Sequence, residues 1–115
     1  MNSNRLLELN REDFELYRFL RSNALSDVLD SDIEDLLHRI LLTGGYINIV
    51  LKGDLPVELV ITRLNELNQE DWKQFDYFLN QQHAFSGEVY QMLSKWEGRI
   101  MEAGELIDSY VLQTT

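Results

Sequence analysis

The sequence contains no cysteine and only one proline among its 115 residues. A chain without cysteine forms no disulfide, no thiolate nucleophile and no cysteine metal site, which is typical of proteins in a reducing compartment. The polar start of the chain, residues 1–5, lacks the apolar core of a signal peptide. No apolar run approaches the about 20 residues that a membrane-spanning helix needs. We therefore expect a cytoplasmic protein with no membrane partner.

Basic side chains are also scarce. The 10 Lys and Arg residues stand against 20 Asp and Glu residues, which gives a formal net charge of -10. Binding to a phosphate backbone draws its affinity from many Lys and Arg contacts, so we expect no direct contact with nucleic acid. A protein with a basic surface is a more suitable partner.

The length and composition fit a single domain that covers residues 1–115. Hydrophobic residues make up 44% of the chain, and the mean hydropathy is -0.27. These values are ordinary for a folded protein with one core. Global disorder is therefore not expected.

The most specific feature of the sequence is a repeated phrase. Residues 5–13 (RLLELNRED) and 63–71 (RLNELNQED) agree at seven positions. After a two-residue shift, Arg39 aligns with Arg99 and Gly44 with Gly104. The alignment predicts two repeat units, about 5–47 and 63–107, joined by a connector at 48–62. Each unit would bury its apolar stripe against the other; the alternative is convergence on a common helix-start phrase.

Capping signals place the helices of these units. Asn10 is a favourable N-cap, which predicts a helix over 11–23. Ser31 and Glu34 have the spacing of a capping box, and the glycines at 44 and 45 predict that this second helix ends near residue 42 or 43. The same start signal at Asn68 predicts a third helix that ends near His83. Helical spacing from Ser86 predicts a fourth helix that continues nearly to the C-terminus.

The segment between the units has a different character. Residues 46–51 are rich in β-branched and aromatic side chains, which predicts a strand. Residues 57–64 fit either a returning strand or the start of a helix. The predicted fold class is therefore mostly α (α+β), with two duplicated helical hairpins joined by a short β-hairpin or by a strand-turn-helix segment. The alternative is an all-α bundle.

Catalytic motifs are absent from the sequence, which has no phosphate loop, nucleophile elbow or zinc signature. One helix face would present Glu34, Asp35 and His38, whose side chains are metal-ligand types. A dinuclear site in a helical bundle needs a second carboxylate-histidine pair, and Gly98 stands at the position equivalent to His38. We therefore predict no enzyme, no metal and no cofactor, with a metal-dependent enzyme as the least favoured alternative.

Two groups of residues are candidates for binding another protein. The first is an acidic segment with no basic residue between Arg21 and Arg39. The second is a surplus of aromatic residues beyond what one helical hairpin needs for its core. The candidate protein-binding residues are Asp27, Asp30, Asp32, Glu34, Asp35, Trp72, Tyr77 and Trp96.

These features predict a small, acidic, non-catalytic protein that binds another protein as a regulatory or adaptor protein. It could also form a homodimer. The alternative is an inhibitor, of the phage-encoded or immunity type, whose carboxylates imitate the charge of a nucleic acid and block a nucleic-acid-binding protein.

Overall fold

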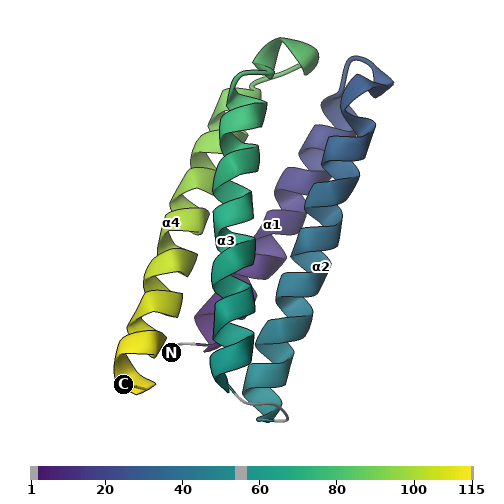
Figure 1. Cartoon of the computed structure of the whole chain (residues 1–115). Coiled ribbons are helices and arrows are strands. Elements are labelled where there is room, and N and C mark those ends of the chain that lie inside the picture. Colours follow the sequence, from purple (N-terminus) through teal and green to yellow (C-terminus); the bar gives the residue numbers. More distant parts are fainter. Residues whose placement is uncertain (1–2, 54–56, 115) are drawn as a thin grey trace.

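The computed structural model describes residues 3–53 and 57–114, with side-chain surroundings as far as residue 109. This part of the chain forms four long helices that run alternately up and down (Figure 1). They are α1 (Ser3–Asn23), α2 (Asp30–Lys52), α3 (Val57–Leu79) and α4 (Val89–Thr114). Short 3-10 turns, η1 (Asp27–Leu29) and η2 (Gln82–Ala84), precede α2 and α4. The molecule is elongated, with extents of 45 × 21 × 19 Å.

The helices form a closed ring in which α1 and α3 each pack against both α2 and α4. The mostly helical prediction is confirmed, and the all-α alternative describes the fold better than the α+β one. No strand occurs among the described residues. The nearest approach to one is an isolated antiparallel bridge between Ala24 and Phe85, where the two ends of the hairpins meet.

The predicted strand at 46–51 is therefore wrong, and of the two structures that residues 57–64 fit, the start of a helix is the one observed. Both segments are helical, the first in α2 and the second in α3. Ile47 is completely buried and belongs to the same apolar cluster as Val60 and Leu64. Burying these helically spaced side chains in one core outweighs the β propensity of the local sequence, which is a weak and context-dependent preference.

The helix end predicted near residue 42 or 43, before the glycines at 44 and 45, is also wrong, because α2 continues to Lys52. Gly53 ends it with a φ of 71°, a left-handed conformation that glycine adopts without strain. Gly44 does not end the helix; it lies where α1 approaches α2 closely. A Cβ atom at Gly44 would lie 2.8 Å from Oδ1 of Asn10, so the glycine allows α1 and α2 to pack closely.

The N-cap predictions fail for a related reason. Asn10 and Asn68 lie inside α1 and α3, not at their starts. Nδ2 of Asn10 donates a hydrogen bond to the backbone carbonyl of Ile40 at 2.9 Å, and Nδ2 of Asn68 donates to that of Ile100 at 3.1 Å. Buried leucines before each asparagine, Leu6 and Leu64 among them, extend the helices past the local start signal.

The predicted capping box at Ser31 and Glu34 is likewise not formed, since α2 already begins at Asp30. The helix-capping serine of this region begins the 3-10 turn η1 and not α2. Ser26 is its N-cap, and the Ser26 hydroxyl oxygen accepts a hydrogen bond from the backbone amide of Val28 at 3.4 Å. The chain therefore enters α2 through a 3-10 turn.

The core consists of two apolar clusters along the bundle axis. The larger cluster includes Leu16, Leu36, Phe78 and Trp96, and the smaller one includes Ile47. Between the two clusters, α1 and α3 each carry an asparagine and an aspartate into the interior, and α2 and α4 each carry an arginine. This buried polar layer consists of Asn10, Asp13, Arg39, Asn68, Asp71 and Arg99.

Contacts within the polar layer repeat at positions that the sequence alignment pairs. Nε of Arg99 lies 2.7 Å from Oδ1 of Asp13, and Nε of Arg39 lies 2.8 Å from Oδ1 of Asp71. A Cβ atom at Gly104 would lie 3.1 Å from Asn68, as one at Gly44 would lie against Asn10. Each ion pair joins one predicted repeat unit to the other. The origin of the two units by duplication remains a prediction that these matching contacts favour.

Candidate functional site

The buried polar layer contains the most strongly perturbed acids of the described residues. Burial raises the pKa of Asp13 to about 7 and that of Asp71 to about 6, although the paired arginines act in the opposite direction. The enclosed cavity beside them measures only about 30 Å³. The aspartate and arginine side chains are at most 18% exposed. The layer therefore connects the helices internally and leaves no room for an organic substrate.

The residues considered for a metal site do not converge. Within the described ranges, no group of three or more His, Asp and Glu side chains is placed to hold a metal ion. Glu34 instead accepts a hydrogen bond from the Tyr17 hydroxyl at 3.1 Å and lies 3.2 Å from a guanidinium nitrogen of Arg21. This arrangement gives the metal-dependent alternative no support.

The acidic segment does not form a uniformly negative surface. Arg21 from α1 reaches across to α2, where its guanidinium lies 3.8 Å from Asp30 and 3.2 Å from Glu34. The Asp32 side chain interacts with the hydroxyl of Tyr77, while its backbone carbonyl accepts a hydrogen bond from Gln74 at 2.7 Å. Asp27 and Asp35 are exposed. Three of the five carboxylates thus contact other side chains, and the other two face solvent.

The predicted aromatic residues are divided between core and surface. Trp96 has no exposed surface, and its ring packs against Phe75 and Phe78. Trp72 is half-buried in an edge-on contact with Phe75. Tyr77 is 39% exposed. Tyr77 is therefore the most accessible of the three aromatic candidates, and it lies beside Asp32 at the start of α2.

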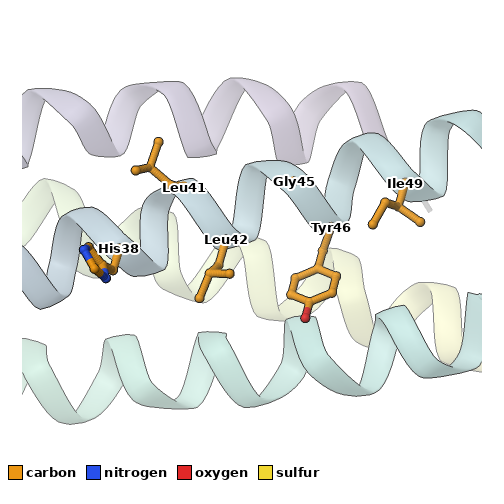
Figure 2. Close-up of a pocket in the computed structure, with 6 residues that line it drawn as sticks. All are labelled: His38, Leu41, Leu42, Gly45, Tyr46 and Ile49. Atoms are coloured by element: carbon orange, nitrogen blue, oxygen red, sulfur yellow. The ribbon is translucent and has the colours of Figure 1, made fainter.

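A different surface, the outer side of α2, has the properties expected of a binding site. Leu41 and Leu42 are 56% and 45% exposed, and Tyr46 and Ile49 are partly exposed beside them. With His38 and Gly45, these residues line a shallow depression of about 590 Å³. Figure 2 shows Leu41 pointing toward α1 and Tyr46 toward α3, with Gly45 between them on the helix. We call these six residues the α2 outer face.

The exposed part of the α2 outer face lies opposite the core side of the same helix, while Tyr46 and Ile49 at its edges also pack against the smaller apolar cluster. Ile33, Leu36, Ile40 and Ile47 point into the bundle, whereas Leu42 is about half a helical turn away from Ile40. Residues 40–51 contain no charged side chain. A helix that is apolar on both sides is typically covered on both sides. A grouped exposed apolar surface of this kind is typical of an interaction site.

The equivalent side of α4 provides an internal comparison. Under the alignment, Leu42, Gly45 and Asn48 correspond to Glu102, Glu105 and Asp108. Glu105 and Asp108 are exposed, and Glu102 is bound to Arg5 with its Oε2 2.5 Å from Nε. In α4 this side therefore has the carboxylates of an ordinary solvent-facing helix. The aligned positions in α2 carry no carboxylate.

Gly45 itself has no evident task inside the bundle. A Cβ atom added there would meet nothing within 4 Å, in contrast to one at Gly44. Glycine in an exposed helix interior costs about 1 kcal/mol relative to alanine. Gly45 instead lines the depression, where the absence of a side chain leaves the α2 backbone uncovered.

The prediction of binding residues did not include the α2 outer face, because the helix was predicted to end near residue 42 or 43 and residues 46–51 were assigned to a strand. The signal was nevertheless present in the sequence. A charge-free stretch at 40–51 in a chain of net charge -10, read with helical periodicity, has apolar residues on two opposite sides.

Comparison of the chain with known protein families, curated proteins and solved structures finds no match in any of the three. Among the described residues, no helix is both long enough and apolar enough to cross a membrane. Function must therefore be inferred from the residues and their arrangement.

Proposed function

We propose that this chain is a small, non-catalytic protein-binding protein, with a regulatory or adaptor role, that docks through the α2 outer face. The observation that carries the proposal is the exposed, uncharged surface of residues 40–51 in a strongly acidic molecule. Burial of apolar side chains such as Leu41 and Leu42 provides affinity, while the surrounding charges limit contacts with unsuitable proteins.

The geometry favours an apolar contact over imitation of nucleic-acid charge. A phosphate-like surface needs evenly spaced, unpaired carboxylates, whereas Arg21 lies between Asp30 and Glu34. The acidic segment is better understood as the charged border of the α2 outer face, since Asp35 lies one turn before His38 on the same side of the helix.

The proposal can be tested with a photo-crosslinking amino acid placed at Leu42 in the source cells. Met101 on α4 is a matched control, because it is 51% exposed against 45% for Leu42. We expect crosslinks to protein from position 42 and few or none from position 101. Introducing Leu42→Glu beside a crosslinker at Leu41 should abolish the product, whereas Met101→Glu should preserve it.

Absence of any protein crosslink from position 42, in cells that contain folded protein, would contradict the proposal. Equal crosslinking from positions 42 and 101 would also contradict it, because random collisions do not distinguish α2 from α4. Circular dichroism of each variant shows that the helices are retained, so that loss of folding is not mistaken for loss of binding.

A further inference from the structure

We infer that the partner on the α2 outer face is a second copy of this chain, with the two α2 helices packed antiparallel across a twofold axis. This inference rests on the proposed function and names the occupant of the proposed site. It is carried by the order of residues along the exposed side of α2, which is complementary to itself.

The exposed side of α2 has the spacing of a coiled-coil seam. Alternating steps of four and three residues, the a and d positions of a heptad, keep side chains on one side of a helix that packs against another. Seven positions follow this pattern and all are exposed or partly exposed. They are Ser31, Asp35, His38, Leu42, Gly45, Ile49 and Lys52.

An antiparallel pairing about a point between Thr43 and Gly44 matches these positions in a complementary way. Leu42 of one copy then faces Gly45 of the second copy, so that a large side chain fills the space above a glycine. His38 of one copy faces Ile49 of the second copy, while Leu41 and Tyr46 flank the seam on its two opposite edges. Contacts of this reciprocal kind define an isologous twofold interface.

The ends of the seam are also complementary in charge. The same pairing brings Asp35 of one copy opposite Lys52 of the second copy. The twofold axis repeats this contact, so that the dimer contains two such pairs. Both residues are exposed. In a parallel pairing, Asp35 would instead face Asp35 and Lys52 would face Lys52. Charge at the ends of the seam therefore selects the antiparallel arrangement.

The equivalent seam on α4 lacks this character. Its corresponding residues are Gln91, Lys95, Gly98, Glu102, Glu105 and Ser109. The central pair, Glu102 and Glu105, would bring carboxylates of two copies together, which is unfavourable. Only one of the two similar halves of the molecule is therefore suited to self-association, which yields a closed dimer in place of an open chain of copies.

The first test is the mass in solution, measured by sedimentation equilibrium over a range of protein concentrations. We expect the wild-type chain to approach twice its single-chain mass of 13.5 kDa. Leu42→Glu should remain a monomer at every concentration, and Met101→Glu should dimerise as the wild type does. A wild-type chain that stays monomeric throughout, or a Met101→Glu variant that is monomeric while Leu42→Glu dimerises, would overturn the inference.

The second test determines the register, and it uses the absence of native cysteine. Asp35→Cys and Lys52→Cys are exposed substitutions that leave the core unchanged. We expect an intermolecular disulfide when the two variants are mixed and oxidised, and little when either is oxidised alone. The reverse result indicates a parallel pairing and contradicts the proposed seam.

Crosslinking from position 42 in cells distinguishes failure of this inference from failure of the proposed function. A product of this chain with itself supports both. A product with a different protein, together with a monomeric mass in solution, retains the protein-binding function and overturns the second copy as occupant. Absence of any product overturns both.

Discussion

Gly44 and Gly98 show how differently two glycines of one bundle can be constrained. Both lie inside helices, but a Cβ atom at Gly44 would meet Oδ1 of Asn10 at 2.8 Å, whereas one at Gly98 would meet nothing within 4 Å. The side chain of Asn10 cannot easily move away, because it is buried and bound to the carbonyl of Ile40. The space above Gly44 is therefore part of the α1–α2 contact.

We predict that Gly44→Ala destabilises the protein by about 1–3 kcal/mol, since it displaces the buried Asn10 amide from its hydrogen bond to the Ile40 carbonyl. Gly98→Ala should be neutral or stabilising by up to about 1 kcal/mol, because alanine is the better helix former. Urea unfolding of the two variants and the wild type measures the difference. Equal stability of the two variants would show that the close contact with Asn10 does not constrain α2.

The raised pKa of Asp13, about 7, makes the stability of the fold depend on pH. An unfolded aspartate titrates near pH 3.8, so between these values the folded chain binds a proton that the unfolded chain does not hold. The stability from this group is complete below the unfolded pKa and is lost as the pH rises through the folded one. Asp71, with a pKa of about 6, acts in the same direction.

We therefore predict that Asp13→Asn reduces the loss of stability between pH 5 and pH 8, by on the order of 1 kcal/mol. The variant is expected to be less stable overall, because it weakens the ion pair with Arg99. The comparison thus concerns the slope of unfolding free energy against pH. Glu15→Gln removes the same charge from an exposed position and controls for net charge; an identical slope in the wild type and in Asp13→Asn would contradict the prediction.

Single residues explain both what the sequence made predictable and what it did not. The repeated Leu-Asn-x-Glu-Asp phrase indicated correctly that helices dominate, and it contains four of the six residues of the buried polar layer. It did not reveal that Asn10 and Asp13 point inward, since an asparagine before two acids is also an ordinary N-cap. Only the contacts with Ile40 and Arg99, distant in sequence, distinguish the two roles.

At the scale of elements, the end of α2 illustrates competition between local and tertiary preferences. Two adjacent glycines and a β-branched run indicated a helix end followed by a strand, yet α2 continues to Lys52. Ile47 reaches the core only if the helix continues through it. Local propensity differs by less than about 1 kcal/mol per residue, whereas burying one such side chain contributes about 1.5–3 kcal/mol.

The true end of α2 gives a prediction at this scale. Gly53 has a φ of 71°, a conformation that costs a residue with a Cβ about 1–2 kcal/mol. Gly53→Ala is therefore expected to destabilise the protein by about that amount, while Lys52→Ala, one residue earlier within the helix, should have little effect. Thermal unfolding at a fixed protein concentration compares the two. A Gly53→Ala variant with unchanged stability would place the helix end elsewhere.

The same competition explains why the candidate surface was only partly predictable. The acidic segment and Tyr77 were identified from composition, and the structure places Tyr77 beside Asp32. Trp96 was identified by the same reasoning and lies in the core. Composition indicates which residues suit an interface, but helical register decides which of them reach the surface. Because residues 46–51 were assigned to a strand, the side of α2 on which each of them lies was not predicted.

For the whole molecule, the net charge of -10 opposes both folding and self-association. Two copies that meet through α2 bring together charges of the same sign, although the contact itself is uncharged over residues 40–51. The two pairs of Asp35 and Lys52 across the seam contribute attraction of only about 0–1 kcal/mol each. Repulsion between the copies is therefore the larger electrostatic effect.

We predict that added salt strengthens dimerisation, because the Debye length falls from about 30 Å at 0.01 M to about 8 Å at 0.15 M and screens this repulsion. Sedimentation equilibrium at the two salt concentrations measures the change in dissociation constant. A contact dominated by attraction between opposite charges would respond in the opposite way, so weaker association in high salt would contradict an apolar seam.

The ion pairs of Asp13 with Arg99 and of Arg39 with Asp71 join the two predicted repeat units, and these contacts do not depend on which unit comes first along the chain. The start of α1, the end of α2, the start of α3 and the end of α4 all lie at one end of the bundle (Figure 1). A circular permutant that begins at Val57, with the original ends joined by a flexible linker, therefore keeps every helix in place. Asp13 still meets Arg99, and Arg39 still meets Asp71. We expect this permutant to retain its helical circular dichroism and its α2 seam, since the order of the two halves along the chain is interchangeable.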